Sequence, residues 1–310
     1  MRLFSTRLWM ILLFFGLYLP GTMLWADAGT EATDEPIEAL RLSLVTWNIE
    51  WYPGRFRYAR RPRQEEHAAV VKQELARINP DIFLAQEMRG WEAFAGLCSV
   101  VDGLNPVVVS AFRSRSTGQY WPQQIAIASK LPVFAAWSEN WHRDANDVDP
   151  GRGFSVAAIR LPDPFRLLLV YSVHLKSNLA DTESQTRWNY ILRESSTRQL
   201  IDHIREMEEV VFPGLVAGVV VGGDFNTNQD DQFGDRVVEM MLEAGFHKAW
   251  KGVPREERLT WRGSEHYEPT TLDHFFTRGL GTPTAKMLEV SDDTSDHWPV
   301  KIQLEIDVSK

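Results

Sequence analysis

The sequence contains a single cysteine, Cys98, among its 310 residues. An intrachain disulfide is therefore excluded, and the hydrophobic core has to stabilise the fold. Cys98 lies in the apolar segment 94–101, and no other feature of the sequence supports a cysteine nucleophile. We therefore expect it to be a small buried apolar side chain.

Positive charge is also scarce. The chain has 33 Lys and Arg against 42 Asp and Glu, a formal net charge of −9. A protein of this charge does not bind a polyanion through its total charge alone. Five arginines nevertheless crowd the segment between Trp51 and Gln64, at positions 55, 57, 60, 61 and 63. This cluster is either a solvated loop or a surface that binds phosphate, and both interpretations stay open.

The N-terminus differs from the rest of the chain. Two arginines precede an apolar run from Leu8 to Leu19, and Pro20-Gly21 then interrupts it before the small residues of Ala26-Asp27-Ala28. This order predicts a signal peptide over residues 1–28 that is cleaved, giving a secreted or periplasmic protein. An uncleaved anchor is the weaker alternative, because a membrane span needs about 20 apolar residues. After cleavage we expect no stable membrane span and a monomer.

Residues 29–39 are acidic and poor in apolar side chains, so we interpret them as a linker before a single domain, 40–310. In that domain, apolar β-branched runs alternate with amphipathic segments. Strands are expected at 41–47, 82–86, 106–112, 123–129, 153–160, 167–173, 215–221, 271–277, 286–290 and 298–305, and helices at 65–78, 186–211 and 235–244. The pattern favours an α/β sandwich, although one doubly wound sheet would bury the same strands.

Polar side chains stand where these strands end. Gly223-Asp224-Phe225-Asn226 follows a buried strand, and a carboxylate and a carboxamide there can bind a metal, orient water or donate to an oxyanion. Comparable groups recur along the chain in Trp47-Asn48-Ile49-Glu50, Gln86-Glu87, His174-Leu175-Lys176-Ser177, Leu272-Asp273-His274 and Ser295-Asp296-His297. Carboxylates, amides and imidazoles at strand ends are typical of a hydrolytic site on a layered sheet.

Taken in order, these motifs resemble the endonuclease/exonuclease/phosphatase superfamily, in its deoxyribonuclease I-like form, over roughly residues 40–307. The resemblance implies a four-layered α/β sandwich, with two mixed sheets packed face to face and helices outside. It also implies an exported bacterial-type enzyme that cleaves phosphate esters with a divalent metal, Mg²⁺ or alternatively Mn²⁺. Residues 40–310 would then be the catalytic domain.

The resemblance also implies roles for individual residues. Glu87 resembles the main metal-binding carboxylate, assisted by Asn48 and Asp296. These are hard oxygen ligands, which suit Mg²⁺. Catalytic roles are carried over to five further residues: Asp224 would orient or deprotonate the attacking water, Asn226 would donate to a phosphate oxygen, His297 would be the catalytic imidazole held by Asp273, and His174 would stabilise or protonate the departing side.

The expected activity is therefore that of an exported, divalent-metal-dependent phosphodiesterase. Nucleic acid is the first substrate hypothesis, because His174 and His297 occur together with the arginine cluster. A sphingomyelinase-like lipid hydrolase or an inositol phosphate hydrolase is the alternative within catalysis. A non-catalytic binding module on the same fold is the alternative of another class, and the intact Glu87, Asp224 and His297 argue against it.

Overall fold

The computed structural model describes residues 39–162, 165–228 and 234–307. The predicted signal peptide, 1–28, and all of the predicted linker except its last residue lie outside these ranges. All the helices and strands below belong to the unit Ile37–Lys310. No helix of the described ranges combines the length and the apolar character that crossing a bilayer requires.

The strands form two six-stranded mixed sheets. The first sheet contains, from edge to edge, β11 (Lys286–Met287), β12 (Val300–Asp307), β1 (Ala39–Tyr52), β2 (Ile82–Met88), β4 (Gln124–Ser129) and β3 (Asn105–Val109). The second contains β5 (Val133–Asn140), β6 (Gly153–Arg160), β7 (Leu167–His174), β8 (Val216–Asp224), β10 (Asp273–Arg278) and β9 (His247–Lys248). Only the central pairs β1–β2 and β7–β8 are parallel among the described strands.

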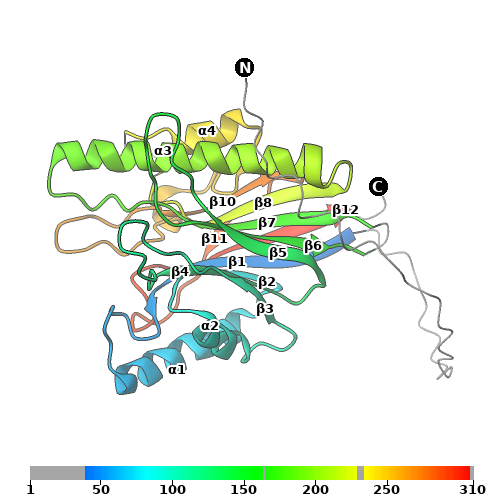
Figure 1. Ribbon diagram of the computed structural model, residues 1–310. Helices are drawn as coiled ribbons and strands as arrows, with labels where there is room; N and C mark the ends of the chain where they lie inside the picture. The colour runs from blue at the N-terminus through cyan, green and yellow to red at the C-terminus, as the bar shows by residue number, and fades with distance from the viewer. Residues whose placement is uncertain (1–38, 163–164, 229–233, 308–310) are drawn as a thin grey trace. The chain divides into compact units, whose positions relative to one another are not determined.

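Helices cover the outer face of each sheet, which gives four layers (Figure 1). The first sheet carries α1 (Arg61–Ile78) and α2 (Trp91–Cys98). The second carries α3 (Glu183–Glu206), continued by a π-helical turn (Met207–Val211), and α4 (Val237–Glu243). A 3₁₀ turn lies at Arg255–Glu257. The four-layered α/β sandwich predicted from the resemblance is confirmed.

Three apolar clusters hold the layers together. Leu44 and Leu84 of the first sheet meet Val170 and Val220 of the second in the cluster between the sheets. The other two clusters pack each sheet against its helices, and Cys98 is buried in one of them, as expected. Gln86 of β2 donates to Thr46 of β1 and to Ser172 of β7, and the second of these hydrogen bonds connects the two sheets.

Besides the two-residue strand β9 and the short π-helical and 3₁₀ turns, one strand and one helix escaped prediction from the sequence. Strand β5 is an edge strand that is only partly buried, so it lacks the continuous apolar run of a central strand. Helix α2 has only eight residues, too few for a helical period to stand out within its apolar segment. In addition, the α-helical part of the predicted helix 186–211 ends at Glu206, and the predicted strand 286–290 is limited to Lys286–Met287.

Candidate active site

Strand register brings three of the predicted catalytic residues abreast in the second sheet. Parallel pairing of β7 with β8 sets His174 opposite Asp224, and antiparallel pairing of β8 with β10 sets Asp224 opposite Asp273. Gly223 permits this packing, because a side-chain carbon there would lie 2.0 Å from the carbonyl oxygen of Val173. The glycine of the Gly-Asp-Phe-Asn motif is therefore required by close backbone approach.

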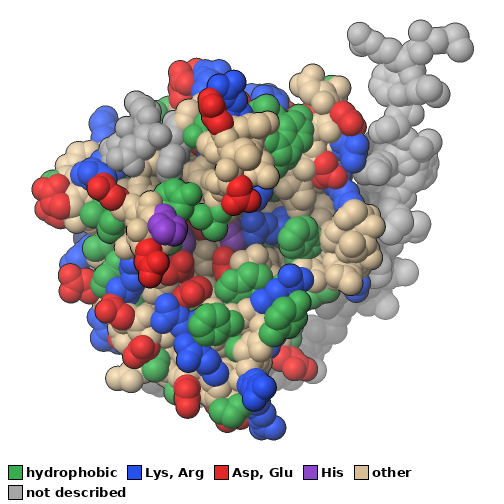
Figure 2. Space-filling model, turned by 90° about the vertical axis from the view of Figure 1, so that its left-hand side faces the viewer, with side chains coloured by type: hydrophobic (Ala, Val, Ile, Leu, Met, Phe, Trp, Pro, Cys, Tyr) green, Lys and Arg blue, Asp and Glu red, His purple; other side chains and the backbone are tan. Residues whose placement is uncertain are grey.

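Seven of the eight predicted site residues line one pocket of about 520 Å³. They are Asn48, Glu87, His174, Asp224, Asn226, Asp296 and His297. The eighth, Asp273, is buried and contacts His297. Residues separated by up to 249 positions in the chain therefore reach one cavity, from Asn48 to His297. On the face drawn in Figure 2, histidine and acidic side chains gather near the middle, with Lys and Arg side chains around them.

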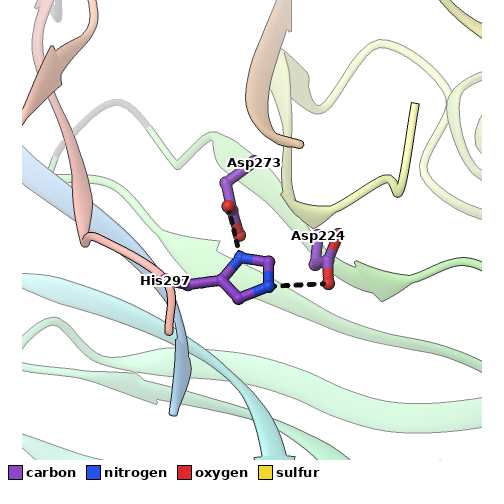
Figure 3. Close-up of side chains that lie close together, drawn as sticks. All are labelled: Asp224, Asp273 and His297. Atoms are coloured by element: carbon purple, nitrogen blue, oxygen red, sulfur yellow. Dashed lines mark hydrogen bonds and ion pairs between the residues drawn. The ribbon is translucent and has the colours of Figure 1, made fainter. Parts of the chain in front are cut away.

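His297 lies between two carboxylates (Figure 3). Its Nδ1 is 2.7 Å from Oδ2 of Asp273, and its Nε2 is 3.8 Å from Oδ2 of Asp224. The backbone amides of Leu272 and Asp273 both donate to Oγ1 of Thr260, and these two hydrogen bonds hold the backbone of Asp273 in place. The arrangement is an Asp–His pair with one ring nitrogen directed at a third acidic group.

The charges of this trio depend on one another. Burial raises the pKa of Asp224 to about 7, although the neighbouring His297 opposes the rise. Burial alone would lower the pKa of His297, but the charges of Asp273 and Asp224 outweigh it and hold that pKa well above the usual value. The two neighbouring carboxylates therefore favour the charged imidazolium form of His297, and burial favours the protonated form of Asp224.

Several further oxygen ligands line the pocket. Nδ2 of Asn48 lies 2.9 Å from Asp224 Oδ2 and 3.4 Å from Glu87 Oε1, so this amide bridges the two carboxylates. The indole of Trp261 donates to Asp296 at 3.1 Å. Burial raises the pKa of Glu50, and the charge of Asp296 adds to the rise while Arg55 opposes it. Such crowding of negative charge in a half-buried site is what a bound divalent cation would relieve.

Two sets of side chains in the site offer ligands for a cation. The ligand atoms of Asp224, Asp273 and His297 lie within 4.8 Å of one another, a spacing that a metal ion could use. However, Nδ1 of His297 and Oδ2 of Asp273 already form a 2.7 Å hydrogen bond with each other. Glu87 and Asp296 also line the pocket and offer only oxygen donors, which fit Mg²⁺ or Mn²⁺ better.

The remaining predicted residues have local partners. The backbone amide of Asn226 donates to Asp224 Oδ1 at 2.9 Å, and its side-chain amide donates to the carbonyl oxygen of Leu175 at 3.3 Å. One side-chain hydrogen of Asn226 is left for a ligand in the pocket. His274, the neighbour of Asp273, points away from the pocket and bonds the carbonyl oxygen of Thr227 at 2.9 Å, as strand alternation requires.

Arg152, which lies between two glycines, was not predicted from the sequence as a site residue. Its guanidinium lines the pocket and contacts Nδ1 of His174 at 2.8 Å. Burial lowers the pKa of His174 well below its usual value, and the charge of Arg152 adds to the effect. In the arginine cluster, by contrast, Arg55 pairs with Glu50 at 2.7 Å, while Arg57, Arg60, Arg61 and Arg63 are exposed.

His67 is a second residue that the sequence did not single out. Its Nδ1 accepts from the backbone amide of Gly54 at 2.7 Å, and its Nε2 contacts the carbonyl oxygen of Thr294 at 2.5 Å. It thereby connects the loop after β1 to the loop that carries Asp296 and His297. Burial lowers the pKa of His67 to about 4, although the bond to Thr294 opposes this.

The depressed pKa of His67 predicts a loss of stability in mild acid. The unfolded chain binds this proton near pH 6.5 and the folded protein only near pH 4, so the contribution of His67 is complete above 6.5 and is lost as pH falls to 4. Urea unfolding at pH 7 and pH 4 should show the wild type losing about 3 kcal/mol more than His67→Gln. Equal losses in the two proteins would contradict this assignment.

Comparison with known proteins settles the family. The model of the Endonuclease/Exonuclease/phosphatase family matches residues 45–297. The chain belongs to this family. No curated protein matches the sequence. It is thus a phosphoesterase of the endonuclease/exonuclease/phosphatase family, with a buried Asp–His cluster at its candidate site.

Solved structures resemble the chain across most of its length. An endonuclease/exonuclease/phosphatase family protein from Bacteroides thetaiotaomicron has a TM-score of 0.62 at 15% identity, covering 87% of this chain and 99% of that one. The mannosyl-6-phosphatase of the same organism has 0.60 at 14%, covering 84% and 98%. The human Nocturnin catalytic domain has 0.61 at 15%, covering 85% and 93%. At such identities the likeness shows the fold alone.

Proposed function

We propose that the protein is an exported, divalent-metal-dependent phosphodiesterase and that nucleic acid is its substrate. The observation that carries the catalytic part is the contact of His297 with Asp273 and its approach to Asp224, in a pocket that Glu87 and Asp296 also line. Displacement at phosphorus needs an activated water, donors for the phosphoryl oxygens and compensation of negative charge. The chain has a residue for each requirement.

The protein's own side chains divide this work as follows. Asp224 accepts a proton from the attacking water, because its pKa of about 7 suits a base that works near neutral pH. His297, charged and held by Asp273, stabilises developing negative charge from Nε2. Asn226 donates its remaining amide hydrogen to a phosphoryl oxygen. Glu87 and Asp296, with Asn48, would hold the divalent ion, which supplies Lewis-acid stabilisation of the phosphoryl group when bound.

Support for nucleic acid comes from the loop after β1. Arg57 and Arg60 are exposed there, with Arg63 exposed in the first turn of α1, near the exposed aromatic residues Phe56 and Tyr58. The guanidinium of Arg57 lies 5.3 Å from the ring centre of Tyr58. Exposed arginines interleaved with aromatic rings combine phosphate contacts with stacking surfaces, which is how single strands are commonly bound. Trp51, near the end of β1 before this loop, lines the pocket.

A lipid phosphodiester is the second candidate, and the pocket rim favours it. Leu179 and Tyr267 line the pocket and are 66% and 51% exposed. Exposed apolar residues at a pocket entrance could contact an acyl chain. A panel of plasmid and single-stranded DNA, RNA, sphingomyelin and inositol phosphates would separate the candidates. Cleavage of lipid alone would overturn the nucleic-acid assignment, and no cleavage of any ester would favour the binding-module alternative.

Glu87→Gln should weaken the dependence on the divalent ion selectively. A neutral amide in place of this carboxylate should raise the Mg²⁺ concentration for half-maximal activity by more than the about 10- to 100-fold typical of outer-shell changes. The measurement is a Mg²⁺ titration of activity and of calorimetric binding after treatment with EDTA. Glu268→Gln is the matched control, because Glu268 is an exposed carboxylate of the same pocket and should leave both titrations unchanged.

A further inference from the structure

Arg152 enters the pocket from the turn before β6, and its backbone is fixed there. Its φ of 44° lies in the left-handed region, which is uncommon for a residue with a side chain. Its carbonyl oxygen accepts from the amide of Trp141 at 2.9 Å and from the side chain of Asn140 at 3.2 Å. The loop between β5 and β6 therefore sets the direction of the guanidinium.

The guanidinium then determines which nitrogen of His174 carries a hydrogen. Nη1 of Arg152 lies 2.8 Å from Nδ1 of His174, and Nη2 donates to the carbonyl oxygen of Leu175 at 3.3 Å. A guanidinium has only donors, so Nδ1 must be the acceptor in this contact. A neutral imidazole whose Nδ1 accepts carries its hydrogen on Nε2.

That Nε2–H group faces the centre of the site. Nε2 lies 3.5 Å from Asp224 Oδ2 and 3.9 Å from Glu87 Oε1, and both distances exceed an ordinary hydrogen bond. His174 is buried and lines the pocket, so its donor points between the two carboxylates toward the cavity. An oxygen atom of a bound ligand could accept from it.

We propose that Arg152 is a positioning residue that fixes His174 as a neutral Nε2–H donor to a phosphoryl oxygen. In this role His174 gives a hydrogen bond and keeps its proton. A proton-donating acid would need hydrogens on both ring nitrogens, and its Nδ1–H would then oppose the guanidinium across the 2.8 Å contact. The identity of the acceptor rests on the proposed function, whereas the tautomer can be tested without turnover.

The direct test is a long-range ¹H–¹⁵N spectrum of histidine-labelled, Mg²⁺-loaded protein at neutral pH, with His174→Gln used to assign the signal. We expect Nδ1 of His174 to be unprotonated and Nε2 to be protonated. In Arg152→Met the ring should populate both tautomers or become charged, and Arg152→Lys should restore the single tautomer. An Nδ1–H or doubly protonated His174 in the wild type would overturn the proposal, whether or not the variants fold.

Turnover provides a second test. On two phosphodiesters that differ only in leaving group, nitrophenol or a simple alcohol, His174→Gln should lower kcat by the same factor. Loss confined to the alcohol ester would show that His174 is a general acid and would overturn the proposal. Arg152→Met should lower kcat by about 10- to 100-fold, as outer-shell changes do, and the exposed Arg143→Met should change neither kcat nor spectrum. If the wild type cleaves neither ester, the substrate panel above decides the proposed function, and the spectrum alone decides the tautomer.

Discussion

His297→Gln should lower kcat by about 10⁴-fold on any ester that the wild type cleaves. Glutamine approximates the size of histidine but cannot become a cation, so the positive charge opposite Asp224 is lost. The 2.7 Å contact with Asp273 shows that the ring orientation is already set in the folded protein. The loss should therefore appear in kcat more than in KM, because the missing charge acts on the transition state. Steady-state kinetics over a range of substrate concentrations up to saturation would measure it.

Controls for this variant separate chemistry from folding. His297 is buried, so its removal also leaves Asp273 without its partner, and circular dichroism must confirm a folded protein at the assay temperature. His247→Gln alters an exposed histidine on the edge strand β9 and should leave kcat unchanged. Asp273→Asn should approach the loss seen in His297→Gln, because an amide can donate to Nδ1 and turn the ring to the wrong tautomer.

The double variant tests whether the two residues act as a unit. If His297 works only when Asp273 holds it, His297→Gln with Asp273→Asn should be scarcely slower than His297→Gln alone. If the double variant instead loses kcat by the product of the two single-variant factors, each residue acts independently, and the assigned pair would be wrong.

The sequence predicted most of the candidate site because its residues sit at strand ends. His174 and Asp224 end the apolar strands β7 and β8, Asp273 begins β10, and register alone brings the three abreast. The family resemblance added the order of the motifs. Asn48 and Glu87 follow the same logic in the first sheet, where β1 and β2 run parallel. The metal-binding and catalytic roles of these residues stay predictions until variants are measured.

The contacts that hold the site could not be predicted in the same way. Arg152 meets His174 because the loop after β5 places it directly before β6, whose antiparallel register pairs Phe154 with Val173, and β5 itself left no apolar period to reveal that loop. His67 bonds Thr294 across 227 positions of the sequence, from a helix to a loop. Such pairings depend on where loops close, and neither composition nor periodicity records that. Arg193, which forms a buried ion pair with Asp235, is a further case.

Arg193→Met should lower the free energy of unfolding by about 3–5 kcal/mol. Arg193 and Asp235 have side chains that are 0% exposed, and Nε of Arg193 lies 3.1 Å from Oδ2 of Asp235. Their pair also organises the loops after two catalytic strands. Arg193 donates to the carbonyl oxygen of Lys176 at 2.9 Å, and Asp235 accepts from Oγ1 of Thr227 at 2.6 Å. Removing the cation leaves a buried carboxylate without compensation.

Urea unfolding of Arg193→Met beside two comparison variants would measure how much the unpaired buried charge lowers the free energy of unfolding. In Arg193→Met with Asp235→Leu no unpaired charge is buried, so much of the lost stability should return. Arg187→Met on the same helix removes an arginine that is 73% exposed and paired with Glu183, and it should change stability by less than about 1 kcal/mol. Because Lys176 and Thr227 adjoin the segments of His174 and Asn226, the double variant should be stable yet slow. A double variant as unstable as Arg193→Met would show that packing, and not the unpaired charge, sets the cost.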